Sequence, residues 1–156
     1  MNLISTQAMN TKRTQFAVVK LGGGGQILVI GGLDQTGTPL ASCELFNPAT
    51  GTWTTLAAVL STARYNHAAV ATANGAILVL GGQGAGAAFL ASVEIFSTGS
   101  GRPELTGTFT TALNGLSSAR ANMVADRLAD GRILVSGGAD SGDAALSTSE
   151  IYSAGI

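Results

Sequence analysis

The chain has 156 residues, of which 46% are apolar and only 11% are charged, and its formal net charge at pH 7 is −1. This composition predicts one folded domain and excludes a disordered chain, while the near-neutral charge argues against nucleic acid as a general partner. The single cysteine, Cys43, excludes a disulfide-bonded scaffold, and no apolar run reaches the roughly 20 residues of a membrane-spanning helix.

The N-terminal third of the chain contains the first copy of a β-rich pattern. Four short apolar or β-branched runs lie at residues 16–19, 27–30, 42–46 and 52–54. Glycine, asparagine and proline separate these runs, which is typical of antiparallel strands joined by tight turns. The second run ends in the pair Gly31-Gly32, and the third contains Glu44 and Phe46. We therefore predict four strands and no helix in this repeat.

Two further copies of the pattern follow. The predicted inner strands are 67–71 and 123–127, and the strands before the repeated glycine pairs are 77–80 and 133–136. The glycine pair recurs after 50 and then 56 residues, and the same spacing leads from each pair to Glu94 or Glu150. The dipeptides Asn74-Gly75 and Asp130-Gly131 predict two-residue hairpin turns with positive φ. A repeat of about 50 residues with several strands predicts a propeller-like array.

The spaced glycine pair, the acidic and aromatic residues and Trp53 resemble the Kelch repeat family, in the variants related to the galactose oxidase propeller. The stretch from Ser42 to Trp53 fits best. In the second repeat Phe109 replaces the tryptophan, after an insertion that includes Arg102-Pro103. The resemblance implies an all-β propeller of four-stranded blades, at about 13–60, 64–113 and 120–156 in a single domain spanning residues 1–156.

Three blades do not close a propeller, since closed propellers have about four to eight. The third repeat stops after its third strand, whereas residues 2–9 align with the fourth strand and linker of the repeat. We expect a homodimer that closes as a six-bladed propeller, with residues 2–9 of one copy completing the third blade of the other. The alternative is that the chain is a piece of a longer propeller.

An arginine and an amide recur two residues apart at the start of each predicted inner strand. The pairs are Arg13 with Gln15, Arg64 with Asn66, and Arg120 with Asn122. In the Kelch adaptors of ubiquitin ligases the matching residues face a pocket and bind acidic peptides, so the resemblance implies a binding module with an arginine-lined mouth. Guanidinium groups suit carboxylate, phosphate or sulfate, and we expect an anionic peptide, glycan or small ligand there. The alternative is that each arginine pairs with a carboxylate or turn carbonyls and fixes blade packing.

A second function is open at the same mouth, namely metal-independent hydrolysis of phosphate, sulfate or related esters. His67, Tyr65 or Cys43 would then supply the acid, the base or the nucleophile. The repeat equivalents of His67 are Phe16 and Met123, which favours packing, and Cys43 likewise aligns with small residues.

Other expectations concern structure and cofactors. We expect the repeated glutamates to accept hydrogen bonds from turn amides, and Trp53 to pack between blades with its N–H bonded to a carbonyl. One histidine and one cysteine suit no zinc centre, and galactose oxidase's copper ligands have no matching set, so we expect neither metal nor cofactor. No basic start with a long apolar stretch opens the chain. We therefore expect a cytoplasmic location and no membrane partner.

Overall fold

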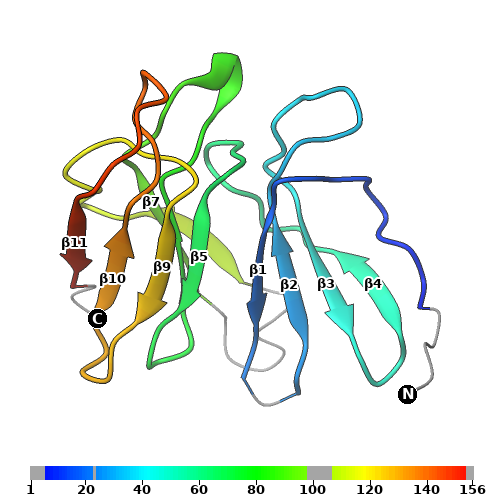
Figure 1. The fold of residues 1–156 in the computed structure, drawn as a ribbon. Coiled ribbons are helices and arrows are strands. Elements are labelled where there is room, and N and C mark those ends of the chain that lie inside the picture. Colours follow the sequence, from blue (N-terminus) through cyan, green and yellow to red (C-terminus); the bar gives the residue numbers. More distant parts are fainter. Residues whose placement is uncertain (1–5, 23, 98–106, 154–156) are drawn as a thin grey trace, which may run out of the picture.

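The computed structural model describes residues 6–22, 24–97 and 107–153. The fold is all-β: three antiparallel sheets stand side by side, each with its first strand innermost (Figure 1). The strands are β1 (Ala17–Lys20), β2 (Ile27–Ile30), β3 (Cys43–Asn47), β4 (Thr52–Thr55), β5 (Ala68–Ala71), β6 (Ile77–Leu80), β7 (Val93–Ser97), β8 (Thr108–Thr111), β9 (Val124–Arg127), β10 (Ile133–Ser136) and β11 (Ser149–Tyr152).

The order within each sheet follows the sequence, β1-β2-β3-β4, then β5-β6-β7-β8, then β9-β10-β11. Within the described part of the chain the third sheet has three strands, as expected for a third repeat that stops after its third strand. Its expected fourth strand falls largely on residues 1–5, which lie outside the described residues. The fourth strand of the second sheet is present despite the change from tryptophan, since Phe109 pairs with Phe96 as Trp53 pairs with Phe46.

The hairpins between β5 and β6 and between β9 and β10 differ from the predicted two-residue turns. In the second sheet Thr72 N–H bonds to Ala76 O at 2.8 Å and Gly75 N–H bonds to Thr72 O at 3.2 Å. Of the loop residues only Gly75 has positive φ, at 87°. The loop therefore has three residues and one left-handed glycine, which is the next commonest hairpin class.

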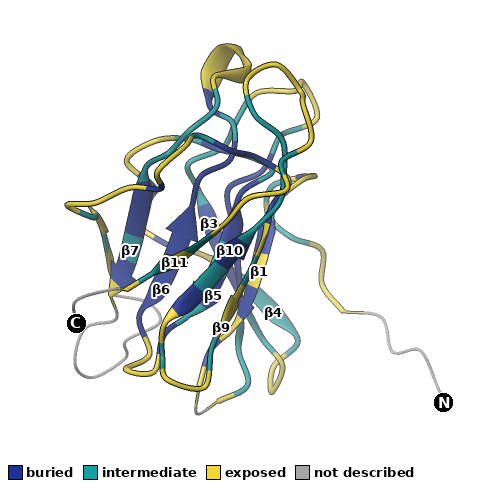
Figure 2. Ribbon diagram, turned by 60° about the vertical axis from the view of Figure 1, so that its left-hand side comes forward, coloured by how far each residue is buried: buried dark blue, intermediate teal, exposed yellow. Residues whose placement is uncertain are grey.

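Two apolar clusters fill the spaces between neighbouring sheets. The first joins residues such as Leu28 and Leu45 to Phe96, and the second joins Leu78 to Val135. The middle sheet therefore packs against a neighbouring sheet on each face, and all four residues of β6 are buried (Figure 2). Among the described residues, no third apolar cluster covers the outward faces of the first and third sheets.

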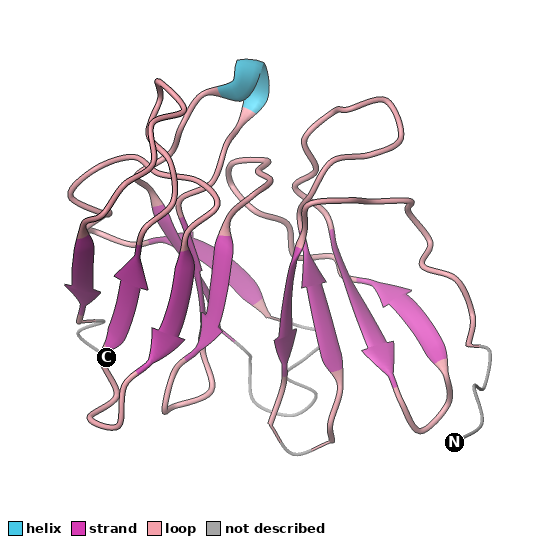
Figure 3. Cartoon of the chain, in the orientation of Figure 1, coloured by secondary structure: helices cyan, strands magenta, loops and turns pink. Residues whose placement is uncertain are grey.

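Loops connect the strands at both ends of the sheets (Figure 3). The one helix among the described residues is the short 3-10 turn Ala85–Ala87 in the loop between β6 and β7. No helix in that same part of the chain has the length and apolar character needed to cross a membrane.

Candidate binding mouth

The innermost strands β1, β5 and β9 lie next to one another, and the residues before them gather at one end of the molecule (Figure 1). The loops that follow β2, β6 and β10 reach the same end. We call this end the mouth. All three predicted arginine–amide pairs fall here because the repeat places each pair just ahead of an inner strand.

The arginine side chains are turned into the protein. The Arg64 guanidinium donates to the main-chain oxygens of Gly81 (2.9 Å) and Ser92 (3.1 Å), and it forms an ion pair of 2.6 Å with Glu94. Arg13 makes the corresponding contacts in the first sheet, including a 2.7 Å pair with Glu44. In both pairs the side chains are almost completely buried.

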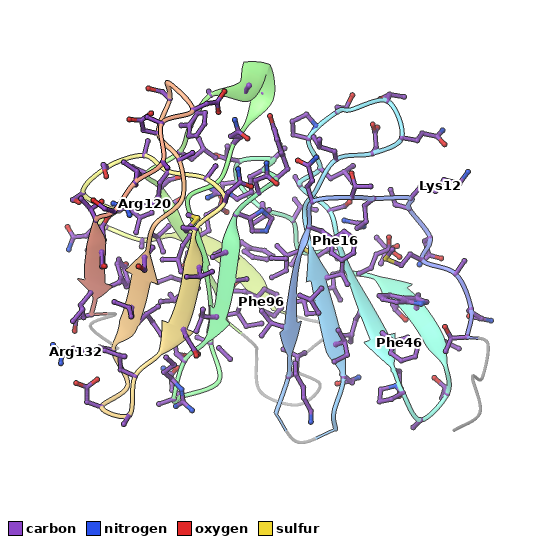
Figure 4. The ribbon with its side chains drawn as sticks, in the orientation of Figure 1. Lys12, Phe16, Phe46, Phe96, Arg120 and Arg132 are labelled. Atoms are coloured by element: carbon purple, nitrogen blue, oxygen red, sulfur yellow. The ribbon has the colours of Figure 1, made fainter. Side chains whose placement is uncertain are left out.

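Arg120 repeats this arrangement in the third sheet, with a 3.0 Å contact to Glu150. Its side chain is 1% exposed, whereas that of Glu150 is 21% exposed. Figure 4 shows Arg120 among the side chains at the loop end of this sheet. The third pair is therefore the most open of the three.

The glutamates also hold the chain that enters each sheet, as the sequence predicted. Glu94 accepts the main-chain N–H groups of Ser61 (2.7 Å) and Thr62 (3.1 Å), and Glu44 accepts those of two residues ahead of Arg13. Burial alone would raise the pKa of Glu44, but hydrogen bonds from Arg13 and the two N–H groups hold it below its usual value. Burial lowers the pKa of Arg64, and the charge of Glu94 partly offsets this effect.

This placement corrects the picture of an arginine-lined mouth. The guanidinium groups are buried and their donors are used by carbonyl and carboxylate groups of the same sheet. The alternative drawn from the sequence, in which the arginines fix the packing of each blade, is the one that these contacts favour. The anionic-ligand prediction loses the physical support it had, since it depended on accessible guanidinium groups.

The amides remain accessible and form a connected row. Gln15, Asn66 and Asn122 all have left-handed backbones, with φ of 54°, 53° and 57°. Asn66 N–H bonds to Gln15 O at 3.0 Å, and Asn122 N–H bonds to Asn66 O at 2.9 Å. Gln15 and Asn122 are exposed and Asn66 is half-buried. Left-handed non-glycine residues are uncommon and cluster at functional sites, so their recurrence at one repeat position singles out this row.

One neighbouring residue was not recognised in the sequence. Gln83 accepts a hydrogen bond from the side chain of Asn66 at 3.2 Å, and its main chain bridges that of Tyr65. The corresponding positions in the other repeats are Leu33 and Ala139, so no repeated polar signal marked Gln83. Tyr65 is half-buried beside this contact.

The groups named for hydrolysis lie in unsuitable surroundings. His67 is 7% exposed, and neither ring nitrogen forms a hydrogen bond of normal geometry, although the Ile30 carbonyl lies nearby. Burial, followed by the charge of Arg64, lowers the pKa of His67 to about 3. Burial raises the pKa of the Cys43 thiol to about 12, so neither group is poised for acid–base or nucleophilic chemistry near neutral pH.

The charged residues in the loops around the mouth are mainly carboxylates. Asp34 accepts hydrogen bonds from the side chain of Thr36 and the main chain of Thr38, and these bonds lower its pKa. Asp140 closes the equivalent loop of the third sheet through two main-chain N–H groups. A shallow pocket lies between the Asp34 loop and Lys12. Across the described ranges, no three His, Cys, Asp or Glu side chains come together as a metal site.

A comparison with family models matches residues 13–59 to the Kelch motif. A comparison with curated proteins gives no match. The matched residues span Arg13 and the whole first sheet, and the glycine pair, the buried arginine–glutamate pair and the aromatic pair of that sheet recur in the second sheet. Residues 13–59 therefore form a Kelch motif, and the second sheet repeats its features.

Proposed function

We propose that the chain is a protein-interaction module that binds an extended peptide segment at the mouth, through the row of amides formed by Gln15, Asn66 and Asn122. The observation that carries this proposal is the row itself, in which one left-handed backbone position presents an amide side chain three times. An amide both donates and accepts hydrogen bonds, as the main chain of a peptide does.

The charges around the row favour a basic side chain in that peptide. Asp34, Asp140 and Asp143 lie in the loops of the mouth, while Lys12 is the exposed cation among the described residues there. The buried arginines are already paired with glutamates and add no free positive charge. A peptide that carries lysine or arginine would therefore be attracted to this end, and salt would weaken the attraction.

We further propose that the row belongs to a six-bladed ring made by two copies of the chain. Three sheets contribute three amides, and a closed ring would present six around one axis. A peptide bound across such a ring would contact amides from both copies. A binding role of this kind needs no cofactor.

The test starts from a phage-displayed library of random linear peptides selected on the wild-type protein. We expect enriched peptides to contain lysine or arginine, and their affinity can be measured by fluorescence anisotropy. Asn66→Gly and Asn122→Gly remove the amides while glycine tolerates the positive φ. Together they should weaken binding about tenfold or more, since one good hydrogen bond contributes on the order of 1 kcal/mol.

Asn74→Gly is the matched control, because Asn74 lies in the hairpin between β5 and β6, at the opposite end of the sheets from the mouth. It should leave peptide affinity unchanged. Equal binding of the selected peptides to the Asn66→Gly/Asn122→Gly variant would overturn the proposed site. Failure of any peptide to enrich would overturn the proposed ligand class.

A further inference from the structure

The junction between the first and second sheets contains four main-chain hydrogen bonds. They are, donor first, Gly32 to Arg64 (2.9 Å), Arg64 to Leu40 (3.2 Å), Asn66 to Gln15 (3.0 Å) and Leu60 to Ala41 (3.0 Å). The junction between the second and third sheets repeats all four. They are Gly82 to Arg120 (2.8 Å), Arg120 to Leu90 (3.2 Å), Asn122 to Asn66 (2.9 Å) and Leu116 to Ala91 (2.7 Å). This set of bonds therefore defines how one sheet follows another.

The groups for a third set are present but divided between the two ends of the array. The third sheet offers Gly138 N–H and three main-chain oxygens, those of Leu146, Asn122 and Ser147. The first sheet offers Arg13 O and three main-chain N–H groups, those of Arg13, Gln15 and Met9. None of these eight groups has a main-chain partner within residues 6–22, 24–97 and 107–153. Each donor at one end corresponds to an acceptor at the other.

The first glycine of each pair shows the same difference between internal and end positions. A Cβ on Gly31 would lie 2.6 Å from Arg64 O, and one on Gly81 would lie 2.6 Å from Arg120 O. A Cβ on Gly137 would meet nothing closer than Leu146 O at 3.6 Å. The next sheet crowds the first two glycines, and Gly137 has no next sheet within the described chain.

The outward faces of the end sheets carry apolar residues at positions that are covered inside the array. Val124 and Ile151 on the third sheet are 71% and 49% exposed. Their equivalents in the second sheet, Ala68 and Ile95, pack against the third sheet. On the first sheet Val18 is 52% exposed, whereas its equivalent Ala69 packs against a neighbouring sheet.

The outward face of the third sheet carries a negative charge and the outward face of the first sheet carries a positive charge, at positions whose equivalents pack in one cluster inside the array. Val19 of the first sheet and Ala71 of the second pack in the same cluster. In register, Asp126 on β9 is the equivalent of Val19, and Lys20 on β1 is the equivalent of Ala71. Both charged side chains are exposed. Docking the third sheet against a first sheet would therefore bring Asp126 toward Lys20.

We propose that the outward face of the third sheet binds the outward face of the first sheet of a second copy of this chain. Under two-fold symmetry the same junction forms twice, and it closes three sheets and three sheets into one ring. Each junction supplies the missing set of four main-chain bonds, a Gln15-to-Asn122 bond among them. The inference deepens the proposed function because it completes the row of amides, and it requires no ligand.

The test is the mass in solution by light scattering over a range of concentrations. The wild type should give twice 15.5 kDa. Asp126→Lys and Lys20→Asp each place like charges in both junctions, and each should weaken the dimer about tenfold. The double variant restores opposite charges and should recover the wild-type dissociation constant. Both positions are exposed, so these changes leave each sheet folded.

Asp130→Lys is the matched control, because it makes the same change in the exposed hairpin between β9 and β10. It should dimerise as the wild type does. A wild-type mass of 15.5 kDa at all concentrations, masses above two copies, or a double variant no tighter than the single variants would each overturn the inference. These outcomes are independent of the peptide selection, which the double variant should pass unchanged.

Amide hydrogen exchange gives a second readout. The N–H groups of Arg13, Gln15 and Gly138 have no main-chain partner in the described part of one chain, so they should exchange rapidly from a monomer. In the proposed dimer all three donate to the second copy and should be protected at high concentration. Loss of that protection in Asp126→Lys at low concentration would support the inference. Rapid exchange at all three in a sample of dimeric mass would assign the contact to another surface.

Discussion

At the scale of single residues, the buried arginine–glutamate pairs hold each sheet to the chain that enters it. Arg64→Met should destabilise the fold by about 3–5 kcal/mol, because Glu94 would remain buried with its guanidinium partner removed. Urea denaturation at fixed protein concentration measures this change. Arg132→Met is the control: Arg132 and Asp130 form an exposed pair, so its midpoint should stay near the wild-type value. Equal midpoints for the two variants would contradict a stabilising role for the buried pair.

His67 makes stability depend on pH. In the unfolded chain its imidazole titrates near 6.5, whereas burial lowers its pKa to about 3 in the folded protein. Above both values the ring is neutral in either state and contributes no pH dependence. As the pH falls below 6.5 only the unfolded state binds a proton, so the free energy of unfolding drops by about 1.4 kcal/mol per pH unit.

His67→Met removes this dependence, and Met123 already occupies the equivalent position in the third sheet. Urea denaturation between pH 7 and 5 should show a flatter profile for the variant than for the wild type. The variant should also be at least as stable at pH 8, since two unpartnered ring nitrogens are gone. Parallel profiles would show that His67 does not carry the proton linkage.

At the scale of elements, the strands before the glycine pairs were predictable and the direction of the arginines was not. The predicted runs 27–30, 77–80 and 133–136 coincide with β2, β6 and β10, because repeat spacing and apolar patterning agree there. The side chain of an arginine ahead of an inner strand can point toward the mouth or into the sheet. It points into the sheet because the third strand of that sheet places a glutamate next to it. That pairing depends on strand register across some 30 residues, which local sequence does not specify.

The row of amides was likewise only partly predictable from the sequence. The sequence marked Gln15, Asn66 and Asn122 as equivalent polar positions, and their shared left-handed backbone emerged only with the structure. Asparagine tolerates that conformation, but glutamine does so less readily, so residue type alone did not predict it. The exchange of Trp53 for Phe109 was easier to interpret, since both rings pack on the preceding strand's phenylalanine at similar distances, 5.0 and 4.9 Å.

At the scale of the whole molecule, Trp53 offers a probe of closure because it is the one tryptophan of the chain. It packs against Phe46 on the first sheet. Its indole N–H donates a hydrogen bond to Gln7 O at 3.0 Å, and a bond from this N–H to a carbonyl was predicted from the sequence. Its equivalent in the second sheet, Phe109, packs against the apolar cluster that the first sheet shares with the second. In the proposed ring, a third sheet from the second copy covers the first sheet's outward face and with it Trp53.

Dilution of the wild type should therefore shift the Trp53 emission to longer wavelength and increase quenching by acrylamide, because dissociation returns the indole to water. The midpoint should move to about tenfold higher concentration in Asp126→Lys and stay in place in Asp130→Lys. The melting temperature should rise with concentration over the same range, since the second copy binds only the folded chain. An emission maximum and a melting temperature independent of concentration, in a sample that scatters as a monomer, would show that the first sheet keeps its outward face in solvent.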